Sequence, residues 1–166
     1  MFHNHIVESL PQADALEWQP LSPKYPRQEL AKALLFALVL LLAALALPVL
    51  VGHGWLLALS LPAALLLGGL LCLHRHRLAI TFGYLVRERD IQSLGGVIWR
   101  AQTALSYCRI QHIAIEQGPW ERHLGLATLN LFSAGSSSAE LVIPGLEEAE
   151  AQRLRQWLLA RIDRHD

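Results

Sequence analysis

Charge is missing from a long stretch of this chain, because residues 33–73 contain no Asp, Glu, Lys or Arg. This absence excludes two surface helices of a soluble fold, since such helices need a polar face. Two apolar runs, 33–51 and 55–73, are separated only by Gly52-His53-Gly54. Each run has about 19 residues and would be roughly 28 Å long as a helix, which matches the hydrocarbon thickness of a bilayer. The sequence therefore predicts a transmembrane hairpin of two antiparallel helices.

Further absences narrow the function. The apolar runs hold no ionisable residue, which argues against a proton relay, an ion path or a transporter site. Lys and Arg together number 14, as do Asp and Glu, so there is no basic excess for a nucleic-acid partner. The two cysteines, Cys72 and Cys108, are interpreted as reduced packing residues. No nucleophile elbow, metal-ligand spacing or Gly-rich phosphate loop occurs, so we expect a protein that is not an enzyme, without catalytic residues, metal site or cofactor.

Positive charge flanks the hairpin at both of its outer ends. Lys24, Arg27 and Lys32 precede the first run, Arg75 and Arg77 follow the second, and the connecting tip carries neither Lys nor Arg. The positive-inside rule then predicts that both termini are cytoplasmic. Small residues spaced four apart favour a close contact between the two helices. They are Ala33 with Ala37 in the first run and Ala64 with Gly68 in the second.

The two flanks of the hairpin differ in size and pattern. Residues 1–32 are too few for a domain, and the prolines between Pro20 and Pro26 predict an irregular cytoplasmic segment. Its Trp18 and Tyr25 are expected to lie on the membrane surface or to pack on the following domain. From residue 78 the pattern changes to short β-rich runs separated by turns. The predicted strands cover 78–86, 91–94, 97–107, 110–116, 124–132 and 139–143.

A helical pattern follows Pro144-Gly145, which ends the last predicted strand. Acidic residues gather at the start of this helix and arginines toward its end, an order that the helix dipole favours. Its apolar stripe is predicted to pack on the core and comprises Ala151, Leu154, Trp157, Leu158 and Ile162. Residues 78–166 therefore predict a cytoplasmic domain, an antiparallel β-barrel or sandwich capped by a C-terminal α-helix. The fold class of the whole chain is an α+β membrane protein.

Several segments of this domain carry a family resemblance. They are Tyr107–Ile113, Gln117–Arg122, Gly125–Ala127, Ser133–Gly135 and Ile143–Leu146. Together with the hairpin they resemble the bacterial pleckstrin-homology-like (PH-like) domain of the second type, and more closely the short YdbS-like membrane proteins of that family. The resemblance implies a PH-like barrel with a C-terminal helix, a place in the bacterial cytoplasmic (inner) membrane, and a frequent neighbour, a larger membrane protein with several copies of the domain. It implies no settled biochemical activity.

Polar residues cluster around two predicted strand ends and form the candidate surface for a partner domain. They are Arg109, Gln111, Gln117, Trp120, Glu121 and Arg122. The alternative interpretation is an internal network of hydrogen bonds and ion pairs that holds a long loop, with Trp120 as a lid over the core. Gly118 and Gly125 are predicted to adopt positive φ or to permit a close backbone approach, and Pro119 to fix a turn.

Basic residues near the membrane form a second candidate site, for anionic lipid head groups. They are Arg75, Arg77, Arg87, Arg89 and Arg100. The alternative interpretation is that these residues lie in a solvated turn, or that basic residues this near the membrane only reflect the positive-inside rule. We therefore expect a non-catalytic module that assembles with a larger membrane protein of the same domain family, in envelope maintenance. The alternative function is binding or sensing of anionic lipid at the inner leaflet, and a second copy of the chain is a further candidate partner.

Overall fold

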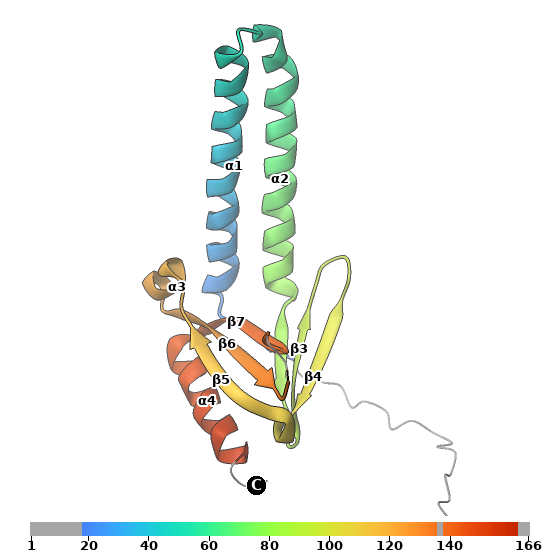
Figure 1. Cartoon of the computed structure of the whole chain (residues 1–166), viewed down its shortest axis with the longest axis vertical. Coiled ribbons are helices and arrows are strands. Elements are labelled where there is room, and N and C mark those ends of the chain that lie inside the picture. The colour runs from blue at the N-terminus through green and yellow to red at the C-terminus, as the bar shows by residue number, and fades with distance from the viewer. Residues whose placement is uncertain (1–17, 136–137, 163–166) are drawn as a thin grey trace, which may run out of the picture.

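The charge-free runs form two antiparallel helices that stand on one end of a β-rich domain (Figure 1). The computed structural model describes residues 18–135 and 138–162. Helix α1 covers Lys24–Leu50 and helix α2 covers Leu57–Thr81, joined by a short turn and the single-turn 3-10 helix Gly54–Leu56. Both α-helices are long and apolar enough to cross a membrane. The predicted pair of antiparallel apolar helices is therefore confirmed.

Both helices extend beyond the predicted apolar runs, toward the domain. Helix α1 begins at Lys24, although the prolines predicted an irregular segment there. Pro26 lies in the first turn, where its missing N–H would have no helical acceptor in any case. Helix α2 runs on to Thr81, so the strand predicted from residue 78 begins only at Gly83. The strand preference of Ile80 and Thr81 is outweighed because adding residues to an existing helix is cooperative.

Small side chains line the contact between α1 and α2. A Cβ atom on Gly68 would lie 2.9 Å from the Cβ of Ala37, so the two backbones approach as closely as glycine allows. Ala33 and Ala44 are buried, and the Ser60 hydroxyl donates to the Ala44 carbonyl at 2.9 Å. This is the packing that the spacing of small residues predicted.

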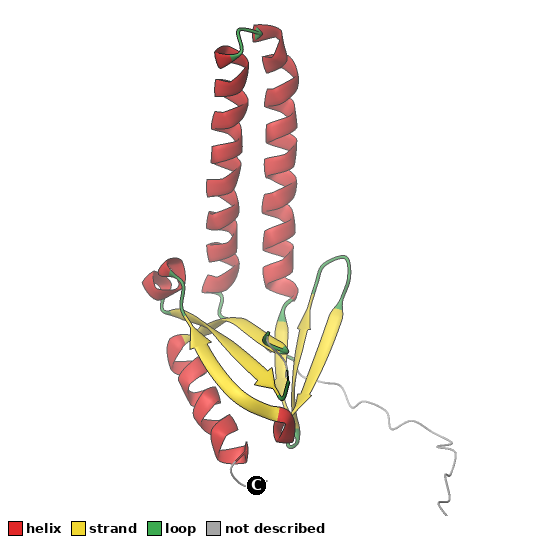
Figure 2. Cartoon of the chain, in the orientation of Figure 1, coloured by secondary structure: helices red, strands yellow, loops and turns green. Residues whose placement is uncertain are grey.

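Seven short strands among the described residues form two antiparallel sheets (Figure 2). The first sheet has the order β1-β2-β3-β4, with strands Gln19–Pro20, Gly83–Val86, Asp90–Gly95 and Ala101–Ser106. The second has the order β5-β6-β7, with strands Ile110–Glu116, Leu126–Ser133 and Leu141–Glu147. The 3-10 helix Tyr107–Arg109 connects the two sheets. The barrel is not closed, because β4 and β5 belong to separate sheets, which fits the predicted sandwich or partly open barrel.

Two helices complete the domain. Helix α3 covers Pro119–Leu124 between β5 and β6, where a loop was predicted, and α4 covers Glu148–Ile162. Helix α4 lies along one side of the strands and buries Ala151 and Leu158 completely. Trp157 contacts the ring of the buried Tyr107 edge-on at 5.7 Å. The predicted apolar stripe of the C-terminal helix therefore does cover the open core.

The N-terminal segment is fastened to the last strand. The Ser22 backbone N–H donates to the Gly145 carbonyl at 3.1 Å, and the Tyr25 ring lies against Gly145 so closely that a Cβ there would overlap it. The predicted strand end at Ile143 is wrong, because β7 continues through Pro144-Gly145 to Glu147. The strand absorbs these two residues where the β6–β7 register shifts, at a β-bulge. Residues 1–17 of the predicted N-terminal segment lie outside the described residues.

Candidate functional site

The hairpin divides the domain into a membrane-facing end and a far end (Figure 1). The membrane-facing end carries the start of α1, the end of α2, helix α3 and the loop between β3 and β4. The far end carries the β2–β3 turn and the 3-10 helix Tyr107–Arg109. This division separates residues that the sequence alone grouped together.

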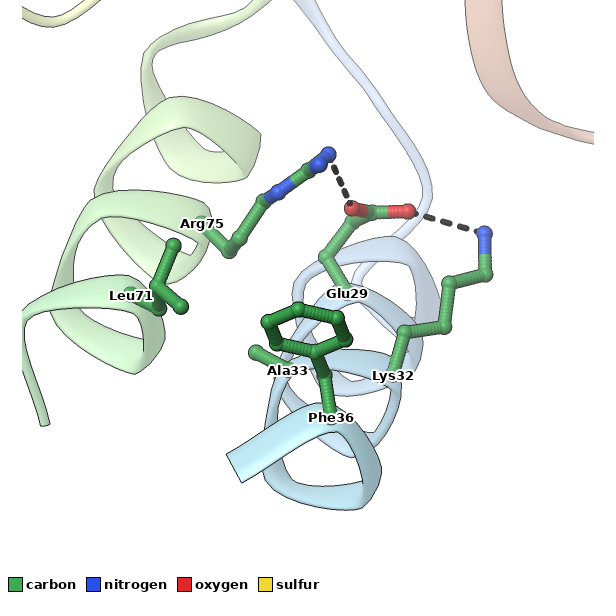
Figure 3. A pocket seen from close by; sticks show the side chains of 6 residues that line it. All are labelled: Glu29, Lys32, Ala33, Phe36, Leu71 and Arg75. Atoms are coloured by element: carbon green, nitrogen blue, oxygen red, sulfur yellow. Dashed lines mark hydrogen bonds and ion pairs between the residues drawn. The ribbon is translucent and has the colours of Figure 1, made fainter. Parts of the chain in front are cut away.

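A cleft of about 400 Å³ lies at the base of the hairpin, where the charge-free runs begin. Figure 3 shows the Glu29 carboxylate of α1 between two cations, at 2.9 Å from Lys32 Nζ and 3.4 Å from Arg75 Nη1 of α2. The side chain of Glu29 is only 10% exposed, whereas that of Arg75 is 55% exposed. Phe36 and Leu71 continue the lining on the apolar side. The Glu29 carboxylate therefore links the two helices, and two cationic side chains lie beside the cleft at the domain end of the hairpin.

Gln28, which precedes Glu29 in the sequence, is a buried polar residue that sequence reasoning missed. It is 1% exposed, and neither atom of its side-chain amide has a hydrogen-bond partner within the described part of the chain. An unsatisfied buried amide costs about 1–3 kcal/mol, so such groups are rare in folded proteins. Glu29 was also missed, although the spacing of Glu29 and Lys32, three apart on one helix, is a readable signal for an ion pair.

The five arginines predicted to contact lipid do not converge. Arg75 lines the cleft, and Arg77 is exposed on the same helix. Arg100 lies in the β3–β4 loop at the membrane-facing end, whereas Arg87 and Arg89 lie in the β2–β3 turn at the far end. The structure thus places three of the five on the side of the membrane and two away from it.

The segment before β6 is stabilised by its own side chains. Glu121 accepts hydrogen bonds from the Gly118 backbone N–H at 2.8 Å and from the Thr128 hydroxyl at 3.2 Å, which caps helix α3. Gln117 donates to the Leu126 carbonyl at 3.0 Å. Gly125 adopts the predicted positive φ of 67° and ends the helix, but Gly118 has φ −70°. Gln117 and Glu121 therefore make the internal contacts of the alternative interpretation.

The other predicted partner-binding residues are spread along β5. Arg109 pairs with Glu140 at 3.5 Å at the far end, and Gln111 is exposed on the strand. Trp120 is 50% exposed on α3 at the membrane-facing end. Since a strand of this length spans roughly 23 Å, Arg109 and Trp120 cannot contribute to one small contact patch. Their binding of a partner stays a prediction.

A groove of about 460 Å³ runs between β5 and α4. Four consecutive strand residues, 112–115, line it, so the groove follows the edge of the strand rather than one face. On this edge β5 pairs with no strand among the described residues. Arg122 of α3 and two residues of α4, Gln152 and Arg155, also line the groove. An unpaired strand edge beside positive side chains can accept an extended acidic segment as an added strand.

Two tyrosines hold the domain together near these surfaces. The Tyr84 hydroxyl donates to Glu150 of α4 at 2.6 Å, and burial together with that carboxylate raises the pKa of Tyr84. The Tyr107 hydroxyl donates to the carbonyls of Arg87 and Asp90 at 2.6 and 2.8 Å, and burial raises the pKa of Tyr107 to about 12. Both phenols are therefore neutral at physiological pH, as their donor roles require.

Comparison with known proteins identifies the family. The family model described as Bacterial PH domain matches residues 28–162, which include most of the hairpin and the described part of the domain that follows it. The chain is 33% identical over 85 residues to the transmembrane protein YdbS of Bacillus subtilis (strain 168). That match covers 50% of this chain and 52% of YdbS, so the chain spans about half the length of this relative. No solved structure matches. With its two apolar helices and split β-barrel, the chain is a YdbS-like membrane protein that belongs to the bacterial PH domain family.

Proposed function

We propose that this protein is a non-catalytic module of the bacterial inner membrane that assembles with a larger membrane protein carrying related domains, in envelope maintenance. In this proposal both termini and the PH-like domain are cytoplasmic. The distribution of charge supports that orientation, since Lys and Arg flank the domain end of the hairpin and are absent from its tip. The Ser22 and Tyr25 contacts with Gly145 support a domain held in a fixed position below the membrane.

The groove between β5 and α4 carries the proposal. An extended segment of the partner would pair with the free edge of β5 and place acidic side chains against Arg122 and Arg155. Backbone hydrogen bonds along the edge supply affinity, and the two arginines make the groove selective for a negatively charged segment. Because both proteins are confined to one membrane, their effective concentration is high and a weak contact is sufficient.

Purification of the tagged full-length chain from its native membrane in mild detergent tests the assembly. We expect a larger membrane protein with related domains to co-purify in stoichiometric amount, as measured by mass spectrometry. The double variant Arg122→Glu/Arg155→Glu should reduce its recovery at least ten-fold. The matched control is Arg153→Glu, because Arg153 lies on α4 outside the groove. Recovery of the chain alone, or equal recovery by the double variant and the control, would contradict the proposal.

Anionic lipid binding is the second candidate function, and the positions of Arg75, Arg77 and Arg100 at the membrane-facing end favour it. Neutralising Arg77 and Arg100 should lower the amount of phosphatidylglycerol that stays with the detergent-purified chain. Neutralising Arg87 and Arg89 at the far end is the matched control and should change nothing. If both double variants lower the amount of retained lipid equally, the position of the arginines relative to the membrane does not matter. The proposal that lipid head groups bind at the membrane-facing end is then wrong.

A further inference from the structure

The loop between β3 and β4 exposes the most accessible large apolar side chains of the domain. Ile98 is 76% exposed and Trp99 is 87% exposed, whereas Trp120, the next in the described part of the domain, is 50% exposed. Arg100 follows directly and is also exposed. Exposed Ile and Trp side chains side by side on a domain surface indicate a contact with an apolar phase or a partner.

Two glycines determine the position and shape of this loop. A Cβ on Gly95 would lie 2.7 Å from the ring of Phe82, the residue that follows α2, so the end of β3 is packed against the base of the hairpin. Gly96 has φ +112°, and a Cβ there would overlap the Trp99 carbonyl. The loop is thus a tight turn beside α2, and it points back along that helix rather than away from it (Figure 1).

The height of the loop can be worked out from the register. Leu94 pairs with Gly83, two residues beyond the end of α2. From Leu94 the chain can rise by up to about 13 Å to reach Ile98, at ~3.3 Å per residue of extended chain. Helix α2 rises by roughly 12 Å from Thr81 back to Leu73, at ~1.5 Å per residue. Because Gly83 lies about 6 Å below Thr81 in extended chain, the tip of the loop stands at most about 7 Å above Thr81. This is the level of Arg77, just outside the charge-free run that ends at Leu73.

We propose that residues 96–100 form a membrane loop, which inserts Ile98 and Trp99 into the lipid head-group region next to α2. Tryptophan is favoured at this depth because its ring is apolar and its indole N–H still finds a polar acceptor. Arg100 at the base of the loop lies within reach of lipid phosphates. The bilayer is the occupant that the structure favours, because the loop stands beside the cationic end of α2, which carries Arg75 and Arg77 and is where a spanning helix meets the lipid head groups. The inference rests on the hairpin and is independent of the groove on β5.

Spin labelling of the full-length chain in nanodiscs tests the membrane loop. The nanodiscs contain equal parts phosphatidylcholine and phosphatidylglycerol, and Ile98→Cys carries the label in a Cys72→Ser/Cys108→Ser background. The label at position 98 should be relaxed more strongly by lipid-soluble oxygen than by a water-soluble nickel chelate. The matched control is Glu88→Cys in the far β2–β3 turn, which should show the reverse order.

Two results would overturn the membrane loop. A label at position 98 as accessible to the nickel chelate as the label at position 88 would place the loop in water. A label shielded from both reagents would show that protein, not lipid, covers it. If the cysteine variant does not fold, quenching of tryptophan fluorescence by brominated lipids tests the same contact. The bromine atoms should quench Trp99 in the wild-type chain, so Trp99→Phe should remove a quenched component of the fluorescence. No loss of quenching on this substitution would equally reject the proposal.

Discussion

Replacing Gly145 by alanine should loosen the attachment of the domain to the hairpin. Gly145 lies in β7 with φ +64°, and its missing side chain leaves the space that the Tyr25 ring of α1 occupies. Alanine therefore meets two separate obstacles: an unfavourable backbone conformation and a collision with a side chain from the other end of the sequence.

The size of the effect follows from these two terms. A non-glycine residue in the left-handed conformation costs about 1–2 kcal/mol. Forcing a methyl group into an occupied space adds about 1–3 kcal/mol, because the ring or the backbone has to move. Gly145→Ala should thus lower the free energy of unfolding of the domain by roughly 2–5 kcal/mol. Gly125→Ala is the matched control, since Gly125 has φ +67° but nothing within 4 Å of its would-be Cβ, and it should show the first term alone.

The assay is thermal or denaturant unfolding of the full-length chain in detergent, followed by tryptophan fluorescence. A double-mutant cycle with Tyr25→Ala tests the collision, because removing the ring takes away the two nearest overlaps and leaves only the Cβ of residue 25, at 2.6 Å, so the cost of Gly145→Ala should fall toward that of Gly125→Ala. Equal destabilisation by Gly145→Ala and Gly125→Ala in the wild-type background would refute the reasoning. So would a cost of Gly145→Ala that Tyr25→Ala leaves unchanged.

Three further predictions concern the helices and the core. Gln28→Met should raise the free energy of unfolding by about 1–3 kcal/mol, because it removes a buried amide without partners among the described residues, and a loss of stability in detergent would contradict this. The pKa of Tyr107 is raised to about 12, so its contribution to stability is complete below pH 10 and is lost as the pH rises toward 12. Tyr107→Phe should flatten the pH dependence of stability in that range, and an unchanged slope between pH 10 and 12 would count against it. Gly68→Leu should separate α1 from α2, because Ala37 leaves no room for a side chain, which cysteine cross-linking across the hairpin would detect as a lost contact.

Much of the architecture could be predicted because it depends on patterns within short segments. Hydropathy and length identified the hairpin, and the small residues at Ala37 and Gly68 identified its contact face. Glycines and β-rich runs located the strands of the domain approximately, and the charge order and apolar stripe located α4. Local preference failed at element ends, where Thr81 stayed helical and Pro144-Gly145 stayed in a strand. At Thr81 the cooperative extension of an existing helix outweighs the local strand preference, and at Pro144-Gly145 a β-bulge in the pairing with β6 keeps both residues in the strand.

The candidate sites were predicted less well, because they depend on which segments meet. Arg109 and Trp120 are close in sequence but lie at opposite ends of the domain, since β5 extends between them. Arg87 and Arg100 are also close in sequence, yet the β2–β3 turn that holds Arg87 lies at the far end of the domain and the β3–β4 loop that holds Arg100 lies at the hairpin end. The groove needs α4 to return to the edge of β5, which no local pattern specifies.

The sequence by itself determined that this chain has two adjacent apolar helices long enough to cross a membrane, followed by a β-rich domain with a C-terminal helix. Hydropathy and periodicity are sufficient for that, because they act over neighbouring residues. Only the tertiary structure decided how the domain is fixed below the hairpin, through Ser22 and Tyr25 on Gly145. It also decided that the loop carrying Ile98 and Trp99 lies at the same end of the domain as the hairpin, and that one edge of β5 pairs with no strand among the described residues. These features arise from contacts between residues far apart in the chain, and the energy of such contacts exists only once the chain has folded.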